Sequence, residues 1–251
     1  MRCKIGVFDS GIGGLTVLHA CVLQAEGEYY YFGDNANAPY GTKTGEEIYA
    51  LSKQVFDLFL KIGVDVAVIA CNTATAVCIE RLRREYPFPI VGTEPAIAPA
   101  ARRHKKCLLL ATRATLSSER VHKLLSCFPE TEFVLSAPAG LVEEVEAKRN
   151  NLSLVDLSFL SGFSGTGVIL GCTHFVWLKD RISERFSVYD GNEGIARRLC
   201  ALLKEREGMF NHNFREIKPP QGQVLKVNEN VKICFIGENF MKNYDVYEQM
   251  F

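Results

Sequence analysis

The chain has 251 residues, of which 47% are hydrophobic, and its 29 Lys and Arg residues balance 29 Asp and Glu residues. This length and composition allow one large domain or two domains of ordinary size with packed apolar cores. A balanced charge provides no net positive field for nucleic acid or for an anionic membrane surface, so we expect neither as a partner.

The amino terminus enters a β-rich run at residues 4–8 and shows neither the apolar core of a signal peptide nor an apolar run of membrane length. We therefore expect a cytoplasmic protein. Nine scattered cysteines favour free thiols over disulfides there, and no spacing among them matches the paired C-x-x-C pattern of a zinc site. We expect no bound metal.

A glycine-rich turn at residues 9–16 follows the first strand and leads into a helical pattern. Its glycines fall as G-x-G-G and not as the G-x-G-x-x-G of a dinucleotide site, so the pattern gives little support to phosphate binding. Two other interpretations remain. The segment is a simple tight turn, or it places Asp9 and Ser10 at the carboxyl end of the strand while the helix amino terminus faces an anion such as a carboxylate.

A second strand at residues 29–33 leads to a loop that contains Pro39, Tyr40 and Gly41. The Gly-Thr-Lys-Thr end of this loop is similar to part of a P-loop, but Ala36 stands where a Walker motif requires its first glycine. We therefore expect a binding loop of another kind. The next segment has apolar side chains at helical spacing and predicts a helix that faces the core.

The third predicted strand, at residues 64–70, is rich in small and β-branched apolar residues and stops at Cys71, Asn72 and Thr73. Such a run suits a strand that is buried on both faces of a parallel sheet. Ligands bind at the carboxyl ends of strands in open α/β sheets. A thiol with an amide and a hydroxyl beside it at this end therefore indicates a site.

The second half of the chain has the same design. A strand at residues 107–110 leads to a turn with Thr112 and Thr115, and an apolar strand at residues 167–171 ends in Cys172. The two strand-end cysteines lie 101 positions apart.

The spacing of the polar groups supports an internal repeat. Ser10 precedes Cys71 by 61 positions, and Thr112 precedes Cys172 by 60 positions. Hydroxyl-bearing turns and thiol-bearing strand ends thus recur at nearly the same separation.

The remaining segments complete an α/β pattern. Helices are predicted at residues 141–145, 152–163 and 191–205, and a last strand at residues 231–237 precedes a short helix. Residues 207–222, which contain glycine, asparagine and proline, predict a linker.

Two thiols in repeated positions favour a shared function, although a lone strand-end cysteine is usually a small buried hydrophobe. If the halves face each other, the thiols flank one small ligand from opposite sides. Inversion at a carbon centre needs this arrangement, because one base removes a proton from one face and a conjugate acid returns a proton to the other. The candidates for tuning the thiols are Asp9, Glu143 and His174, and the candidate hydrogen-bond donors to carboxylates are Ser10, Asn72, Thr73, Thr112, Thr115 and Thr173.

Five motifs in order carry a family resemblance. They are Asp-Ser-Gly-Ile-Gly-Gly-Leu-Thr (9–16), Gly-Asp-Asn-Ala-Asn-Ala-Pro-Tyr-Gly (33–41), Ala-Cys-Asn-Thr-Ala (70–74), Gly-Thr-Glu-Pro-Ala-Ile-Ala-Pro-Ala (92–100) and Gly-Cys-Thr-His-Phe (171–175). Together they strongly resemble the glutamate racemases of bacterial cell-wall synthesis. The resemblance implies a cofactor-independent enzyme that converts L-glutamate to D-glutamate for peptidoglycan by two-base proton transfer at Cα.

The resemblance also implies an α/β fold with two similar three-layer domains. Their sheets would be mainly parallel and related by a pseudo-twofold axis, with the active site between the domains. The first domain would be discontinuous, with residues 1–94 and 206–251, and the second would comprise residues 95–205.

The resemblance assigns functions to individual residues. Cys71 and Cys172 are the expected acid/base pair, with Cys71 serving the D face and Cys172 the L face. Asp9, Glu143 and His174 are expected to assist them. The expected substrate contacts are Ser10, Pro39, Tyr40, Gly41, Asn72, Thr73, Thr112, Thr115 and Thr173.

Several alternatives stay open. The segment before Glu143 is about two residues shorter than the family pattern, so either Glu143 or Glu144 could face the site. Aspartate and hydantoin racemases share the two-thiol plan and form the alternative activity. A thiol redox protein and a nucleotide-binding module are alternatives of other classes, and the sequence leaves a homodimer open.

Overall fold

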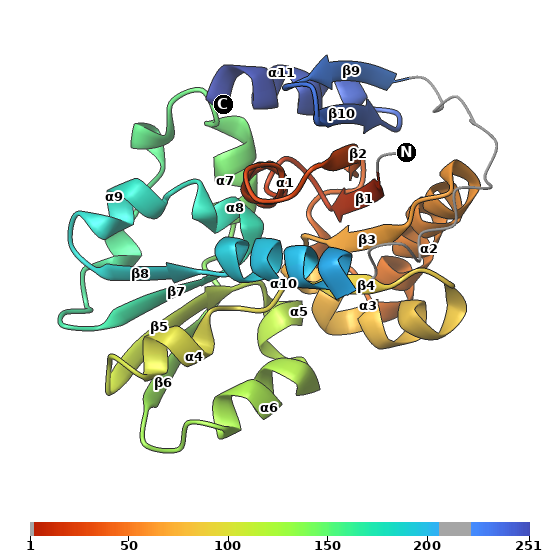
Figure 1. Cartoon of the computed structure of the whole chain (residues 1–251). Helices are drawn as coiled ribbons and strands as arrows, with labels where there is room; N and C mark the ends of the chain where they lie inside the picture. Colours follow the sequence, from red (N-terminus) through yellow and green to blue (C-terminus); the bar gives the residue numbers. More distant parts are fainter. Residues whose placement is uncertain (1–2, 206–221) are drawn as a thin grey trace.

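The structure, a computed structural model, describes residues 3–205 and 222–251 as two open sheets with helices packed on them (Figure 1). The larger sheet has the strand order β4-β3-β1-β2-β10-β9, and every neighbouring pair except the antiparallel β10 and β9 is parallel. Its strands are β1 (Lys4–Asp9), β2 (Gly27–Gly33), β3 (Val66–Ile69), β4 (Ile90–Gly92), β9 (Gly222–Lys226) and β10 (Val231–Ile236).

The smaller sheet is wholly parallel and has the order β6-β5-β7-β8. Its strands are β5 (Lys106–Ala111), β6 (Glu132–Ser136), β7 (Gly167–Gly171) and β8 (Ser187–Asp190). This order repeats the β2-β1-β3-β4 part of the larger sheet, so β1 corresponds to β5 and β3 to β7. The predicted α/β fold with two mainly parallel sheets is confirmed, and the repeat that the spacing predicted is visible in the topology.

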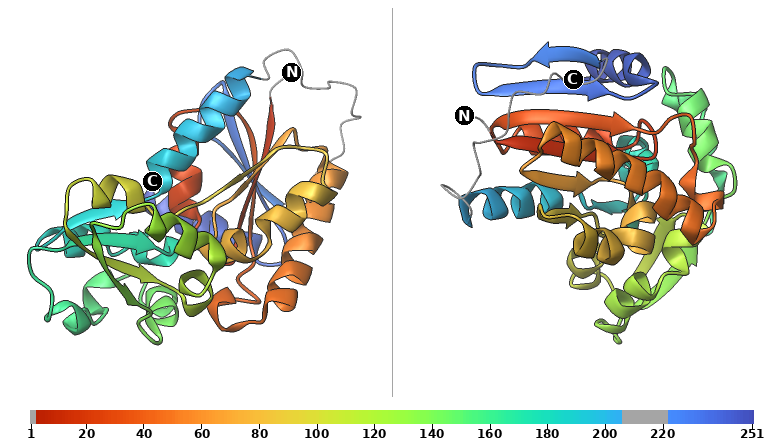
Figure 2. Two further views of the ribbon diagram at one scale, coloured as in Figure 1. Left: turned by 90° about the horizontal axis from the view of Figure 1, so that it is seen from below. Right: turned by 90° about the vertical axis from the view of Figure 1, so that its right-hand side faces the viewer.

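The helices cover both faces of the sheets, as the two views of Figure 2 show. In the larger sheet, Phe8 and Ile69 belong to a core with residues of α2 and α3, whereas Val7 and Tyr31 point to the opposite face. Alternate strand residues thus face opposite helical layers. The helices are α1 (Leu15–Val22), α2 (Gly45–Ile62), α3 (Asn72–Glu85), α4 (Ile97–Ala101), α5 (Arg113–Leu116), α6 (Glu119–Ser126), α7 (Leu141–Ala147), α8 (Thr173–Val176), α9 (Lys179–Ser183), α10 (Asn192–Glu205) and α11 (Phe240–Met250), with the 3₁₀ turn η1 at Tyr40–Thr42.

One hydrophobic core joins the two sheets. It includes Val7 and Tyr31 from the larger sheet and Leu110 and Leu170 from the smaller one, all almost fully buried. The helix α10 packs against α1 and crosses from the second half to the first. The carboxyl ends of both sheets are thereby held close to each other.

The end of the chain returns to the first sheet, because β10 pairs with β2. This pairing agrees with a discontinuous first domain, while the boundaries at 94/95 and 205/206 stay predictions. The predicted linker at residues 207–222 lies outside the described residues except for Gly222. Strand β9, which begins there, was missing from the sequence-based assignment because it lies at the sheet edge, where half-exposed and exposed residues alternate.

The helix predicted for residues 152–163 is wrong. The structure has two short 3₁₀ turns instead, at Leu152–Leu154 and Ser158–Leu160. Between them, Asp156 accepts hydrogen bonds from the backbone N–H and the hydroxyl of Ser158 at 2.8 and 2.9 Å. Such local bonds compete with a helix. Arg181 also donates a hydrogen bond to the carbonyl of Val155 at 2.9 Å, so this carbonyl is satisfied by a side chain and not by a helical backbone N–H.

None of the helices in residues 3–205 and 222–251 has the length and apolar character that crossing a bilayer requires.

Candidate active site

The first half of the site is formed at the ends of β1 and β3. Asp9, the last residue of β1, is fully buried and accepts hydrogen bonds from the Gly11 N–H at 2.9 Å and from the Thr173 hydroxyl at 3.1 Å. The Cys71 thiol follows β3 and lies 3.4 Å from the Ser10 hydroxyl oxygen, to which it donates. Because β1 and β3 are parallel, these side chains lie together at the carboxyl-terminal end of the sheet.

Cys71 also begins the helix α3. Its sulfur accepts the backbone N–H of Ala74 at 3.5 Å, so the thiol occupies the N-cap position of a 14-residue helix. Unpaired N–H groups at a helix amino terminus favour negative charge nearby. A thiolate on Cys71, or a substrate carboxylate beside it, would gain from this position.

The second half of the site is formed at the ends of β5 and β7. Cys172 follows β7, is almost buried, and precedes the short helix α8, which carries Thr173 and His174. The His174 ring nitrogen Nε2 lies 2.7 Å from the Glu146 carboxylate oxygen Oε1. Because β7 corresponds to β3, the two thiols occupy equivalent places in the two sheets.

Both thiols line one enclosed pocket between the two halves of the molecule, of which the first is built on the larger sheet and the second on the smaller. Its cavity volume is about 10 Å³, which is room for about one water molecule. The lining residues are Ser10, Pro39, Tyr40, Gly41, Cys71, Asn72, Thr73, Thr112, Val142, Cys172, Thr173 and His174. Eleven of these twelve residues are site residues that the sequence analysis predicts, and Val142 is the one that it does not.

Three threonines connect the halves at the wall of this pocket. The Thr73 hydroxyl lies 2.8 Å from that of Thr112 and 3.3 Å from that of Thr115, and the last two are 3.0 Å apart. Thr112 also caps α5 by accepting the Thr115 N–H. On the same side, a Cβ atom at Gly41 would lie 2.8 Å from the Thr112 Cβ, so the η1 turn touches the second half.

Two further pocket residues, Tyr40 and Asn72, differ in whether their polar side-chain atoms have a hydrogen-bond partner. The Tyr40 hydroxyl donates to the Asp34 carboxylate at 2.7 Å, and this contact fixes the ring against the pocket. The side-chain oxygen of Asn72 is buried and has no hydrogen-bond partner among the described residues. A buried polar atom without a partner is costly unless something else binds it. Asn72 is therefore suited to contact a polar group of a ligand.

The first half holds a protonated thiol. Burial, together with the nearby Asp9 carboxylate, raises the pKa of Cys71 to about 12, although Ser10 and Ala74 act in the opposite direction. Burial likewise raises the pKa of Asp9 to about 6, against the opposing charge of His174. At neutral pH, Cys71 is therefore a neutral thiol and Asp9 is mostly a carboxylate.

The second half holds a positive charge. Burial lowers the pKa of His174, but hydrogen bonds and charge interactions with Cys172 and Glu146 outweigh it and raise the pKa to about 10. Burial raises the pKa of Glu146, yet its contacts with His174 and Lys242 prevail and lower it to about 2. At neutral pH the His174 ring is therefore an imidazolium, and it lies beside Cys172.

Glu143 is not part of this cluster in the structure. Its side chain is exposed on α7, and the adjacent Glu144 forms an ion pair with Lys148 at 3.0 Å on the outer side of the helix. Glu146 is the acid of α7 that contacts His174. A catalytic function for Glu143 stays a prediction that this arrangement does not support.

Sequence reasoning missed Glu146 and Lys242. Glu146 lies three residues after Glu143 on α7. Because the segment before this helix is shorter than the family pattern, the sequence did not determine which acid of the helix faces the site. Lys242 belongs to α11, 96 positions away from Glu146, and only the return of the chain end brings them together. No local pattern could have revealed this contact.

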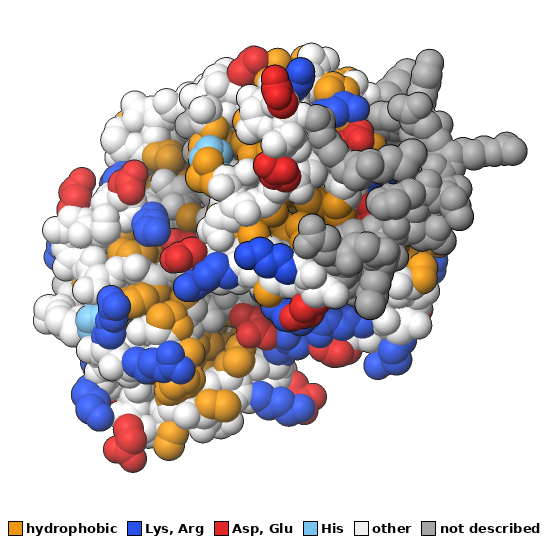
Figure 3. Space-filling model, viewed as in Figure 1, with side chains coloured by type: hydrophobic (Ala, Val, Ile, Leu, Met, Phe, Trp, Pro, Cys, Tyr) orange, Lys and Arg blue, Asp and Glu red, His pale blue; other side chains and the backbone are white. Residues whose placement is uncertain are grey.

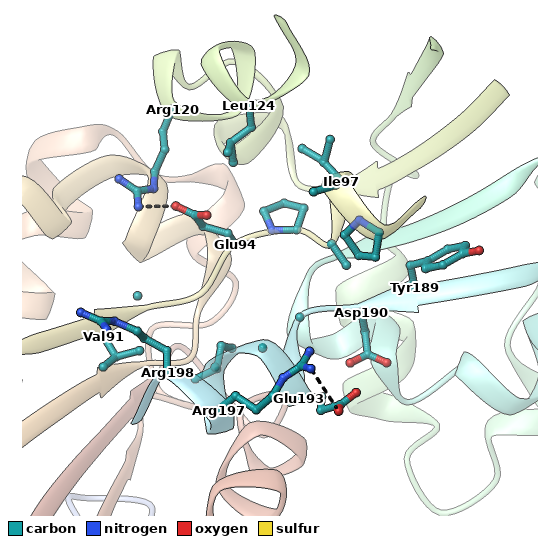
Figure 4. A pocket seen from close by; sticks show the side chains of 18 of the residues that line it. Val91, Glu94, Ile97, Arg120, Leu124, Tyr189, Asp190, Glu193, Arg197 and Arg198 are labelled. Carbon is teal, nitrogen blue, oxygen red and sulfur yellow. Dashed lines mark hydrogen bonds and ion pairs between the residues drawn. The ribbon is translucent and has the colours of Figure 1, made fainter. Parts of the chain in front are cut away.

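A much larger cavity lies elsewhere. It has a volume of about 1110 Å³ and is lined mainly by β4, α4, α6 and α10 (Figure 4). In it, Arg120 forms an ion pair with Glu94, and Arg197 forms one with Glu193. Figure 3 shows basic side chains around the hollowed part of this face. Neither thiol lines this cavity, so size alone does not identify the site of the proposed chemistry.

The nine cysteines are free thiols in the structure. Within residues 3–205 and 222–251, no group of three or more His, Cys, Asp or Glu side chains is arranged to hold a metal ion.

Comparison with known proteins identifies the family. The model of the Asp/Glu/Hydantoin racemase family matches residues 5–199. The glutamate racemase of Halothermothrix orenii is 40% identical over 216 residues, which cover 80% of this chain and 85% of that protein. That of Bifidobacterium longum is 38% identical over 223 residues, covering 80% of this chain and 84% of that protein.

A solved structure agrees over nearly the whole chain. The crystal structure of Escherichia coli glutamate racemase in complex with L-glutamate and the activator UDP-MurNAc-Ala has a TM-score of 0.77 at 30% identity. The match covers 99% of this chain and 95% of that one. From its sequence, fold and paired strand-end thiols, the chain belongs to the aspartate/glutamate/hydantoin racemase family.

Proposed function

We propose that the protein is a glutamate racemase that interconverts L- and D-glutamate without a cofactor. The observation that supports this most is the placement of Cys71 and Cys172 at equivalent strand ends around one pocket. The choice of glutamate rests on relatives that carry this name at 35 to 40% identity. A cytoplasmic supply of D-glutamate for peptidoglycan is the biological function that follows.

In the direction from L to D, the Cys172 thiolate removes the α-proton and the Cys71 thiol delivers a new one. The Cα–H bond breaks as the Cys172 S–H bond forms, and the electron pair stays on the substrate. The Cys71 S–H bond then breaks as the new Cα–H bond forms on the other face. The raised pKa of Cys71 suits the thiol that delivers the new proton, and the imidazolium of His174 lies beside Cys172.

The substrate carboxylates would be bound mainly by neutral donors. The pocket lining contains hydroxyls of Ser10, Thr73, Thr112 and Thr173 but no Lys or Arg. Backbone N–H groups at the start of α3 add positive potential on the same side. The unpartnered Asn72 oxygen suits the substrate ammonium group, which has only donors to offer.

Substrate binding requires the two halves to separate. Glutamate is much larger than the water molecule that a cavity of about 10 Å³ can hold. The pocket walls come from both sheets, through Cys71 and Thr73 on one side and Thr112 and Cys172 on the other. Separation of the two halves at this pocket admits the substrate, and their closure excludes water from the charged intermediate.

The proposed function predicts D-glutamate formation by the purified protein alone. After dialysis against a chelator, the protein should racemise L-glutamate without added pyridoxal phosphate, nucleotide, flavin or metal. Chiral chromatography of the product measures this result. An absolute requirement for added pyridoxal phosphate, or racemisation of aspartate in preference to glutamate, would contradict it.

A further inference from the structure

The His174 side of the pocket is completed by the carboxy-terminal helix. Glu146 is mostly buried, and its two carboxylate oxygens are engaged separately. Its Oε1 accepts from His174 Nε2 at 2.7 Å and from the Ile12 N–H at 3.2 Å, while its Oε2 accepts from Lys242 Nζ at 2.7 Å. One acid on α7 is therefore held by the second half through His174 and by the first half through Ile12 and Lys242.

We propose that Lys242 and Glu146 are positioning residues for the Cys172 half of the reaction. Lys242, acting through Glu146, orients His174 and sets how strongly its positive charge acts on Cys172. This inference rests on the proposed racemase function only for its kinetic consequences, since the charge arrangement itself can be measured on the free protein.

The geometry links this arrangement to closure of the halves. Lys242 and Ile12 belong to elements on the larger sheet, and Glu146 and His174 belong to elements on the smaller one. Separation of the halves would remove two of the three donors from Glu146. The fully bonded chain from Lys242 to His174 thus exists only in the closed site, where proton transfer takes place.

The surrounding charges determine the sign of each change. His174 faces the Cys172 thiol and the carboxylates of Glu146 and Asp9, and Tyr31 lies nearby with a pKa that burial raises well above its usual range. Removing the negative charge of Glu146 should lower the pKa of His174. Removing the positive charge of Lys242 should raise it, because Glu146 then has one cation fewer.

Two variants test these opposite signs. The pKa of His174 is measured by NMR titration of its ring, assigned by loss of the signal in a His174→Asn protein. We expect a pKa below the value of the unmodified protein in Glu146→Gln and above it in Lys242→Met. A role in packing alone would give no pair of opposite shifts.

The matched control is Lys148→Met, which removes a lysine from a Glu144 ion pair of 3.0 Å on α7 that does not contact His174. It should leave the His174 titration unchanged. A Lys242→Met protein whose His174 titrates like the unmodified protein, or at a lower pKa, overturns the proposal. If Glu146→Gln fails to fold, as seen by circular dichroism, the Lys242→Met result decides alone.

The kinetic readout adds a direction-specific signature. In Glu146→Gln, kcat/KM should fall at least about tenfold, and equally for both enantiomers, because their equilibrium constant is one. Proton transfer at Cys172 becomes the slower step. The primary isotope effect should therefore rise with α-deuterated L-glutamate and fall with α-deuterated D-glutamate. Isotope effects that change equally in both directions would contradict an action through Cys172.

An inactive unmodified protein would refute the racemase function but not the charge arrangement, which the His174 titration tests independently.

Discussion

We expect that replacing either Cys71 or Cys172 with alanine abolishes glutamate racemisation while the protein stays folded. Both thiols line the pocket, and in the proposed mechanism each serves one face of Cα, so the loss of one leaves inversion without either its base or its acid. A positioned acid or base typically contributes about 10² to 10⁴-fold, and we expect at least this loss in kcat/KM for each variant. Both positions are small strand ends with little packing volume to lose, and circular dichroism should show an unchanged fold.

Cys78→Ala is the matched control for Cys71. This cysteine lies on α3, is equally buried, and donates to the Ala74 carbonyl at 3.0 Å without lining the pocket. Its replacement should cost some stability but little activity. Substantial racemisation by Cys71→Ala or Cys172→Ala, or equal losses in Cys78→Ala, would show that the thiols do not form the acid/base pair.

The second large effect is expected at Gly13, where the glycine-rich turn meets the other half. A Cβ atom there would clash with the Thr173 hydroxyl oxygen and would lie 2.7 Å from the His174 backbone nitrogen. A backbone atom cannot move aside cheaply, so Gly13→Ala should hold the halves slightly apart. A misplacement of about 1 Å can cost about 10²-fold in rate, and we expect a loss of this order in kcat/KM.

Gly45→Ala is its control. Gly45 opens α2, and its added Cβ would make only an ordinary contact of 3.5 Å with Val77. The control should retain full activity and match or exceed the original stability, because alanine is the better helix former. Kinetics of Gly13→Ala equal to those of Gly45→Ala would show that close contact at the turn is not required.

The glycine-rich turn shows what the sequence could and could not reveal. The G-x-G-G spacing gave little support to a dinucleotide fingerprint. One of the two remaining interpretations placed Asp9 and Ser10 at the carboxyl end of the strand, with the helix amino terminus facing an anion. The actual close contact, of Gly13 with the Thr173 hydroxyl and the His174 backbone nitrogen, lies between segments about 160 positions apart. Local patterns carry no information on such contacts.

The two thiols were predictable because their signal is local and repeated. Each follows a short apolar strand, and parallel strands in an α/β sheet present their carboxyl ends at one edge. The choice of acid on α7 was not predictable in the same way. Glu143, Glu144 and Glu146 lie within one turn of helix, and only the packing of α7 against Ile12 and Lys242 selects Glu146.

The helix prediction for residues 152–163 was wrong for a related reason. Its apolar residues fit a helical period, but Asp156 and Ser158 satisfy each other locally. Tertiary contacts such as the bond from Arg181 to the Val155 carbonyl then stabilise the irregular path. Periodicity predicts the buried side of a helix, not whether the backbone completes its turns.

Solvent labelling tests the central claim, that two thiols act on opposite faces of Cα, most directly. Thiols exchange with water between turnovers, so the incoming proton carries the solvent label. L-glutamate converted to a low extent in D₂O should give D-glutamate almost wholly deuterated at Cα, whereas the recovered L-glutamate should stay largely unlabelled. D-glutamate that keeps its original α-hydrogen would show that one base carries the proton across, and would contradict the two-thiol account.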